Sequence, residues 1–339
     1  MKKFFLSLLP FIFGTAICIL IVILFASRPA ESLRILFTGN FTSTYYFGSM
    51  LNTASFLMIA GAGAAFSIRG GNMNLGGEGQ VYLGGFIAGL VLSSSWTVPP
   101  FIQFCTALLL CVASGIVAAS VSALLKEMRN AEVLLTSFLL SAALIPIIDS
   151  LITAINGKSG QNLLALPYIN EAFCMKAILP PSSLNMSFFI AVFICIILAL
   201  ILEKTSSGRK IAIWGKAPLF AQYSGYSSKA NSFFTLAVSG ALHALTGFFA
   251  VCGTYFTCHK GFYAGMGWNA LSTALIARSN PLLVIPVSLA LAWLYTSADR
   301  IGLTQGFAFD ISAILQGFIL FAISVPVVIS SVKKSGGKK

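Results

Sequence analysis

The sequence predicts an all-α polytopic membrane protein, and its hydropathy indicates about ten transmembrane helices. Hydrophobic residues make up 57% of the 339 residues, charged residues make up 9%, and the mean hydropathy is +0.91. A chain of this composition cannot cover its apolar surface with polar groups in water, so we expect lipid to be its solvent. The long, unbroken apolar runs are typical of helices and not of β-barrel strands, which alternate apolar and polar residues.

Polar interruptions divide the apolar sequence into two groups of expected helices. The first group lies at about 4–26, 47–68, 79–92, 101–125, 133–153 and 186–202. The second group lies at about 232–253, 265–277, 282–297 and 308–329. Lys2 and Lys3 precede the first apolar run, as in a signal peptide, but the run is longer than the 7–15 residues typical of one. We therefore expect a retained membrane helix.

We interpret residues 1–339 as a single transmembrane domain. Its parts are a first helix with an outside segment (1–46), a first helical half (47–203), a polar cytoplasmic loop (204–231), a second helical half (232–329) and a basic tail (330–339). The net charge of +12 would suggest a nucleic-acid partner in a soluble protein. Here most Lys and Arg residues fall in loops that one orientation places in the cytoplasm. The positive-inside rule therefore predicts that both termini are cytoplasmic, and we expect no nucleic-acid partner.

Two glycine-rich segments interrupt the helical pattern. The segment RGGNMNLGGEGQ, at 69–80, is a poor helix because glycine disfavours helical structure. A comparable segment, GTYFTCHKGFYAGMGWN, lies at 253–269. It follows an expected helix that, in this topology, crosses the membrane in the direction opposite to 47–68. The pair predicts broken helices related by an inverted repeat.

The first interruption carries candidate residues for a substrate pathway. Non-helical backbone at membrane depth is tolerated only where protein or a water-filled cavity satisfies its polar groups. Glu78 is the sharpest candidate, because a carboxylate in the membrane is costly unless it is paired or hydrated. It either contacts substrate or forms a structural lock with Arg69, Gln80 or backbone N–H groups of the glycine segment. Asn72, Asn74 and Gln80 suit a neutral polar ligand, such as a sugar hydroxyl or a purine edge, or they bond one helix to another.

The second interruption adds Trp268 and Asn269, which are candidates to stack on and bond the same ligand. Trp268 is also typical of a membrane-interface anchor. His243 and His259 are the only histidines, without HExxH or a Cys/His cluster, so we expect no metal site. Ser239 lies four positions before His243, which leaves an intramembrane serine protease as a remote alternative to a packing role.

Two further carboxylates, Asp149 and Asp310, fall near expected helix ends, where a carboxylate can remain hydrated, so neither needs a functional role. No GxxxxGK[ST] motif occurs in the sequence. We therefore expect no catalytic residues and no cofactor in this chain, and any ATP that drives transport would be bound by a partner ATPase.

Several stretches resemble one family of ABC transporter permeases, which serves branched-chain amino acids, ribose and nucleosides. MNLGGEGQ, at 73–80, resembles the family signature FNIGxEGQ. NAEVLLTSFLLS, at 130–141, and ALIARSNPL, at 274–282, resemble two further family stretches. The loop GRKIAIWGKAPLFAQYSGYS resembles the family's coupling loop, which sits on the ATPase. Its matching positions, to which the resemblance assigns ATPase coupling, are Gly208, Gly215, Pro218, Ala221 and Gly225.

The resemblance is greatest to permeases of purine-nucleoside importers, with simple-sugar permeases as an alternative. It implies the membrane-spanning subunit of a bacterial ABC importer in the inner membrane. The implied partners are a cytoplasmic ABC ATPase, a second related permease subunit, an extracytoplasmic substrate-binding lipoprotein and a small polar substrate. An ion-coupled secondary transporter that uses Glu78 in a broken helix is the alternative from another class.

Overall fold

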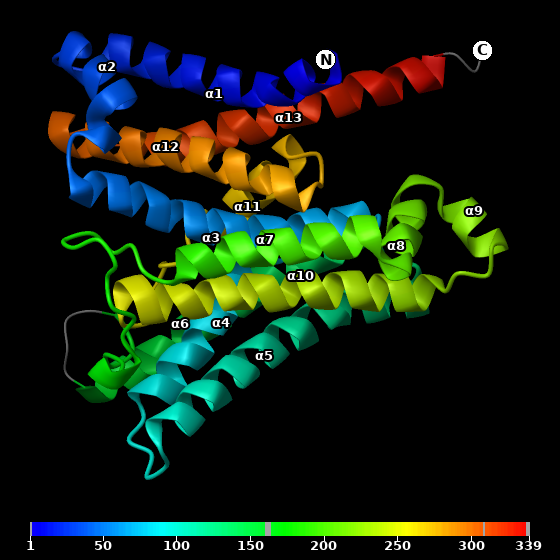
Figure 1. The fold of residues 1–339 in the computed structure, drawn as a ribbon, viewed down its shortest axis with the longest axis horizontal. Coiled ribbons are helices and arrows are strands. Elements are labelled where there is room, and N and C mark those ends of the chain that lie inside the picture. The colour runs from blue at the N-terminus through cyan, green and yellow to red at the C-terminus, as the bar shows by residue number, and fades with distance from the viewer. Residues whose placement is uncertain (1, 160–163, 308, 337–339) are drawn as a thin grey trace.

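The computed structural model describes residues 2–159, 164–307 and 309–336, and helices dominate this part of the chain (Figure 1). Each expected apolar segment contains a helix, and several helices run further than expected. These helices are α1 (Lys2–Phe25), α3 (Thr44–Arg69), α4 (Gly77–Ser93), α5 (Pro100–Arg129), α6 (Val133–Ser159), α7 (Ser187–Lys204), α10 (Ser228–Ala250), α11 (Met266–Ile276), α12 (Pro281–Gln305) and α13 (Ile311–Gly336).

Shorter elements fill the connections. The segment before α3 contains α2 (Pro29–Thr38), and the polar loop at 204–231 folds into α8 (Ser206–Lys216) and α9 (Pro218–Tyr223). Three further turns are helical: η1 (Gly39–Phe41), η2 (Glu171–Phe173) and the π-helical turn η3 (Val251–Tyr255), which continues α10. The described residues contain no strand, and one isolated bridge joins Ala165 to His259.

Capping residues explain where several helices begin. The side chain of Asn280 accepts the backbone N–H of Leu282 at 3.0 Å, and Pro281 occupies the first helical position of α12. Thr205 caps α8 in the same way by accepting the N–H of Gly208 at 3.0 Å. These side chains satisfy backbone donors that the helix itself leaves free.

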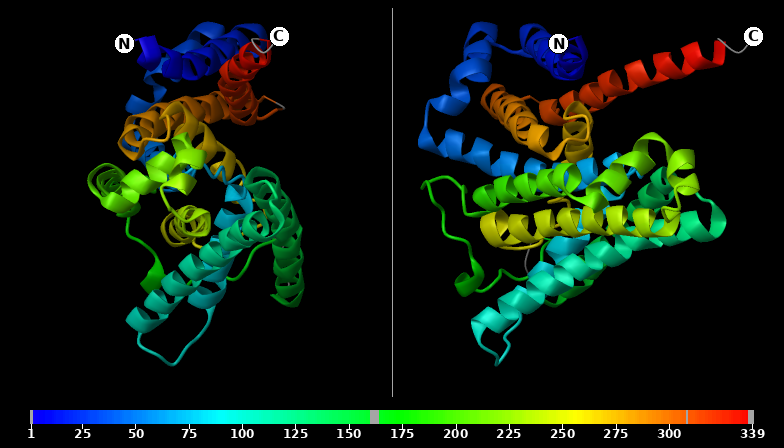
Figure 2. Two further views of the ribbon diagram at one scale, coloured as in Figure 1. Left: turned by 90° about the vertical axis from the view of Figure 1, so that its right-hand side faces the viewer. Right: turned by 45° about the vertical axis from the view of Figure 1, so that its right-hand side comes forward.

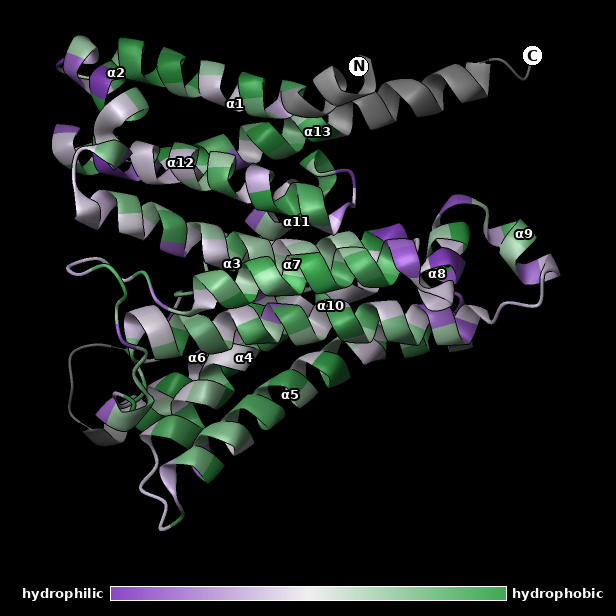
Figure 3. Cartoon of the chain, in the orientation of Figure 1, coloured by the Kyte–Doolittle hydropathy of each residue, from purple (hydrophilic) through white to green (hydrophobic). Residues whose placement is uncertain are grey.

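Six of the described helices are long and apolar enough to cross a membrane: α3, α5, α6, α7, α10 with η3, and α12. The chain is therefore a multi-pass membrane protein. Hydrophobic residues cover these helices, while hydrophilic residues gather on α8 (Figure 3). The helices α4 and α11 are shorter, with 17 and 11 residues. The expected count of ten membrane crossings and the inverted repeat remain predictions.

The long helices lie roughly side by side, with α3 and α10 in the centre (Figures 1 and 2). Small residues let them approach closely. A Cβ atom added to Gly115 of α5 would overlap the carbonyl of Gly240 in α10, and the reverse also holds. The helix α1 lies along α13 at one edge, where the side chain of Ile319 leaves no room for a Cβ atom at Gly14. This packing fixes the positions of the two broken segments.

The two ends of the bundle differ. The start of α1 and the end of α13 lie at the end that also carries α8 and α9, whereas α2 lies at the other end (Figure 1). The helix α3 runs from the end with α2 to the end with α8. Features along α3 can therefore be placed relative to both ends.

Candidate functional site

The break between α3 and α4 is held open by hydrogen bonds from α6. The chain turns at Gly71, whose φ of 78° suits glycine, and residues 72–76 have no regular structure. Ser137 Oγ accepts the N–H of Leu75 at 2.9 Å, and Ser141 Oγ accepts the N–H of Gly79 at 2.7 Å. Protein side chains therefore satisfy backbone donors that a continuous helix would satisfy internally.

Glu78 joins the two interruptions. Its side chain is buried, and Oε1 accepts the backbone N–H groups of Gly267 at 3.0 Å and Trp268 at 3.1 Å. Both donors belong to the first turn of α11, where a helix has free N–H groups and a partial positive charge. The sequence offered Arg69, Gln80 or the backbone N–H groups of the first glycine segment as partners of this carboxyl. Its partner is instead the start of α11, in the second glycine segment. The second oxygen, Oε2, is buried without a hydrogen-bond partner among the described residues.

The short helices α4 and α11 begin at the same point in the bundle. A Cβ atom on Gly267 would overlap the backbone N of Glu78, and one on Gly77 would lie 3.0 Å from Gly267 Cα and 2.9 Å from His243 Nε2. Both positions require glycine because the two backbones touch. Two half-helices therefore meet N-terminus to N-terminus, with the Glu78 carboxyl at the start of α11.

Asn74 and Gln80 tie the break to α10. The amide of Asn74 donates to Gln80 Oε1 at 2.9 Å and to Ser239 Oγ at 3.0 Å, and its oxygen accepts the N–H of Gly76 at 2.9 Å. These polar side chains are buried. Their bonds connect protein segments, which is the arrangement expected of a structural network.

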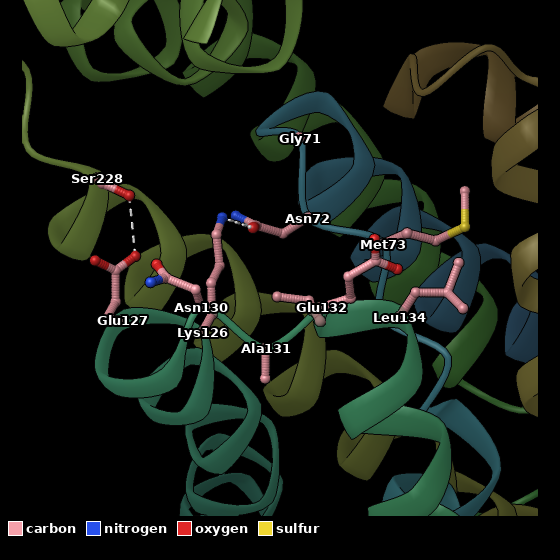
Figure 4. A pocket seen from close by; sticks show the side chains of 11 residues that line it. Gly71, Asn72, Met73, Lys126, Glu127, Asn130, Ala131, Glu132, Leu134 and Ser228 are labelled. Carbon is pink, nitrogen blue, oxygen red and sulfur yellow. Dashed lines mark hydrogen bonds between the residues drawn. The ribbon is translucent and has the colours of Figure 1, made fainter. Parts of the chain in front are cut away.

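Asn72 lies between α10 and α5, at the wall of a cavity of about 410 Å³ (Figure 4). Its amide donates to Thr235 Oγ1 at 2.9 Å, and its oxygen accepts from Lys126 Nζ at 2.6 Å. Glu127, the next residue of α5, accepts from Ser228 Oγ at 2.9 Å. This cavity opens where α5 ends and α10 begins, so it is separate from the Glu78 contact.

Trp268 and Asn269 leave α11 in different directions. The Trp268 ring lies 6.2 Å from the ring of Phe138 in α6. Asn269 lines a second cavity, of about 350 Å³, together with residues of α3, α12 and the start of α13. The structure therefore brings Glu78 close to the start of α11, but it places Asn72 and Asn269 in the walls of two different cavities.

The geometry of Ser239 and His243 gives no support to a protease. His243 Nδ1 lies 2.7 Å from the backbone oxygen of Ser239 and 3.4 Å from its Oγ. A carbonyl oxygen only accepts, so Nδ1 carries the proton and cannot act as a base toward the hydroxyl. Among the described residues, no group of three or more His, Cys, Asp or Glu could hold a metal ion.

The expected coupling positions shape the α8–α9 segment. Gly208 packs on the end of α7, Pro218 starts α9, Ala221 is buried, and Gly225 has a φ of 76°. At Gly215, a Cβ atom would overlap the backbone oxygen of Arg69, and the same glycine touches Gly71. The end of α8 therefore rests directly on the end of α3 and on the break.

Exposed apolar side chains mark the outer face of α9. Leu219, Phe220 and Tyr223 are 70%, 62% and 90% exposed. This face lies at the end of the bundle where hydrophilic residues gather (Figure 3). Such a surface is typical of a protein interface.

The site also contains Lys126, Ser137 and Ser141, which were not among the residues expected from the sequence. Ser137 and Ser141 are four residues apart in an apolar helix, so they share one face, which is the pattern that would have indicated a hydrogen-bonding role. Lys126 has no such pattern, because its partner Asn72 lies in a distant part of the sequence.

Sequence comparison finds several similar permeases. The chain is 31% identical to the probable riboflavin import permease protein RfuC of Treponema pallidum, over 96% of this chain and 86% of that protein. It is 24% identical to the guanosine ABC transporter permease protein NupP of Bacillus subtilis, over 97% and 96%. It is 23% identical to the nucleoside ABC transporter permease protein NupB of Lactococcus lactis, over 97% and 92%. The model of the branched-chain amino acid transport system permease component matches residues 46–324. The chain therefore belongs to this family of ABC transporter permeases.

Proposed function

We propose that the chain is the membrane-spanning subunit of a bacterial ABC importer for a nitrogen heterocycle that carries a sugar or a sugar alcohol, such as a nucleoside. The observation that carries this proposal is the contact of Gly215 with Arg69 and Gly71, which joins the exposed α8–α9 segment to the helix break. A movement imposed on α8 would reach Asn72 and the break without an intervening flexible linker. Such a connection suits a permease driven by an external ATPase.

In this proposal the chain crosses the inner membrane ten times, with both termini in the cytoplasm. The apolar face of α9 contacts a cytoplasmic ABC ATPase, which binds the ATP, and a second related permease completes the membrane channel. An extracytoplasmic binding lipoprotein delivers the substrate. ATP binding closes the ATPase and displaces α8, which changes the accessibility of the pathway. Most of the selectivity rests with the binding protein, because a tight site in the permease would retain its cargo.

The relatives support two substrates of this class. Guanosine and nucleosides are named for two of the relatives, and riboflavin for the third. All share a planar heterocycle with a hydroxyl-bearing chain or ring. The test is to purify the chain with its associated proteins in mild detergent, identify them by mass spectrometry, and measure uptake of labelled guanosine and riboflavin in proteoliposomes. We expect ATP-dependent uptake of one of the two.

A matched pair of variants tests the coupling route. Gly215→Ala should lower uptake at least tenfold, because its Cβ atom would push against the Arg69 carbonyl. Gly302→Ala, where no atom lies within 4 Å of the added Cβ, should transport normally. Uptake that persists without ATP and follows an ion gradient would replace the proposal with an ion-coupled secondary transporter.

A further inference from the structure

A second cavity, of about 350 Å³, lies away from the α8–α9 end of the protein. Its walls include Ser49, Asn52 and Phe56 from the first half of α3, and Asp299 near the end of α12. Because α3 ends against α8, its first half belongs to the opposite end of the bundle. The volume falls within the range of small-molecule sites, about 300–1,000 Å³.

The floor of this cavity is the start of α11, which Glu78 holds from the other side. Gly265, Met266 and Asn269 face the cavity, while the N–H groups of Gly267 and Trp268 bind Glu78. The contact of Glu78 with α11 therefore helps to position the floor of the cavity. A shift of α11 would change the cavity and the lock together.

Two acidic side chains line the cavity. Asp299 and Asp310 both line it and are exposed, and its described lining contains no Lys, Arg or His. Asp310 Oδ1 also accepts from Ser312 Oγ at 2.8 Å and from the N–H of Ala313 at 3.1 Å, which fixes this carboxylate at the start of α13. Two carboxylates in one cavity favour hydroxyl and cationic donors and repel anions.

Polar atoms in the wall also lack partners. Tyr295 is 4% exposed and Asn269 is half-buried, and neither Tyr295 Oη nor Asn269 Oδ1 has a hydrogen-bond partner among the described residues. Buried polar atoms are normally paired, so these two indicate that water or a ligand completes their bonding. On the opposite wall, Asn52 is already fixed by bonds to Ser183 Oγ at 3.1 Å and Thr254 Oγ1 at 2.9 Å. Phe56 and Met266 add apolar surface for a ring.

We propose that this cavity is a stage of the transport path that admits hydroxyl-bearing ligands without negative charge and excludes phosphate esters. The inference rests on the proposed function and narrows it: a free nucleoside or riboflavin passes, whereas its phosphate ester does not. The ligand's hydroxyl groups donate to Asp299 and Asp310, and its ring lies against the apolar wall. The permease thereby adds a charge filter to the selectivity of the binding protein.

The charge filter can be tested by the reactivity of a single thiol in the cavity. Ser49→Cys is introduced into a chain whose half-buried cysteines, Cys105 and Cys174, are replaced by serine. Membrane vesicles containing the intact transporter are treated with a cationic or an anionic methanethiosulfonate of similar size. Each rate is divided by the rate of the same reagent with a small free thiol in solution. We expect the corrected rate of the cationic reagent to be at least tenfold higher than that of the anionic reagent. Equal rates would overturn the proposal.

Charge-neutral variants identify the source of the effect. In Asp299→Asn with Asp310→Asn the ratio of rates should fall at least threefold, and Asp299→Asn alone provides a second measurement if the double variant fails to reach the membrane. Glu171→Gln removes an exposed carboxylate outside the cavity lining and should leave the ratio unchanged. An unchanged ratio in the Asp299 variants, or an equal fall in Glu171→Gln, would refute the filter.

Ligand protection completes the test. Guanosine or riboflavin, whichever the vesicles transport, should slow the labelling of Ser49→Cys, and its 5′-phosphate should not. Equal protection by the phosphate ester would contradict the proposed selectivity. Failure of the vesicles to take up either compound with ATP would instead overturn the proposed function, while the ratio of labelling rates would still report on the cavity.

Discussion

Replacing Glu78 separates the two roles that its carboxyl could have. Oε1 accepts two buried N–H groups from the first turn of α11. In Glu78→Ala both donors lose their acceptor, at about 1–3 kcal/mol for each buried unpaired group, so we expect a loss of about 2–6 kcal/mol in the free energy of unfolding. Glu78→Gln keeps an accepting oxygen and loses only the interaction of charge with the helix terminus, about 0.3–2 kcal/mol.

Two measurements are needed for each Glu78 variant. Denaturant titration in mixed micelles, followed by circular dichroism, gives the change in unfolding free energy, and uptake in proteoliposomes gives the change in function. If Glu78 is mainly a lock, Glu78→Gln should retain part of the transport and most of the stability, and Glu78→Ala should lose both. Glu132→Ala, at an exposed carboxylate, should change stability by less than about 0.5 kcal/mol.

Two outcomes would refute the interpretation of Glu78 as a lock. The first is a Glu78→Gln protein that inserts normally and has wild-type stability but no transport, since this would assign the carboxylate to the substrate or to proton movement. The second is a Glu78→Ala protein as stable as the wild type, since this would show that the contact with α11 contributes nothing to the fold.

Three further variants test other contacts. Gly267→Ala should reduce the yield of monodisperse protein in size-exclusion chromatography, because its Cβ atom would overlap the backbone where α4 begins. A normal yield would contradict that contact. Gly302→Ala, in open space, is the control. Lys126→Met should lower the free energy of unfolding by about 1.5–3 kcal/mol, the range for a hydrogen bond to a charged group. Lys126→Arg should recover part of this loss. Equal stability of Lys126→Met and the wild type would refute a role for the bond to Asn72. Ala221→Asp should uncouple ATP hydrolysis from uptake, because it places a charge in a buried contact, and normal coupling would remove that role from α9.

The helices could be predicted from the sequence because lipid imposes a long apolar run on each crossing. The break at 70–76 could also be predicted, since its glycines and asparagines disfavour a helix. The two glycine-rich segments were correctly located, yet the contact between them was not. Glu78 binds backbone N–H groups that are 189 and 190 residues away, and those donors exist at any helix start, so no residue type identifies them in a sequence.

The carboxylates illustrate the same limit. Asp149 was expected to remain hydrated near a helix end, but it accepts a hydrogen bond of 2.6 Å from Tyr82 on α4. Asp310 was expected to need no role, and it lines a cavity together with Asp299. Burial and partners depend on which helices become neighbours, and hydropathy reports only that a helix is apolar. The tertiary arrangement therefore had to come from the structure.

The contact of α8 with the end of α3 can couple binding at one end of the bundle to binding at the other. In the proposed function, docking of the ATPase shifts α8. If that shift changes the affinity of the second cavity, of about 350 Å³, for its ligand, equilibrium linkage requires the ligand to change the affinity for the ATPase by the same factor. Occupancy at one face of the membrane would then be sensed at the other through Gly215 and Gly71. The same glycine contact would therefore act in both directions. The affinity of the transporter for its ATPase would differ between the empty and the ligand-bound state.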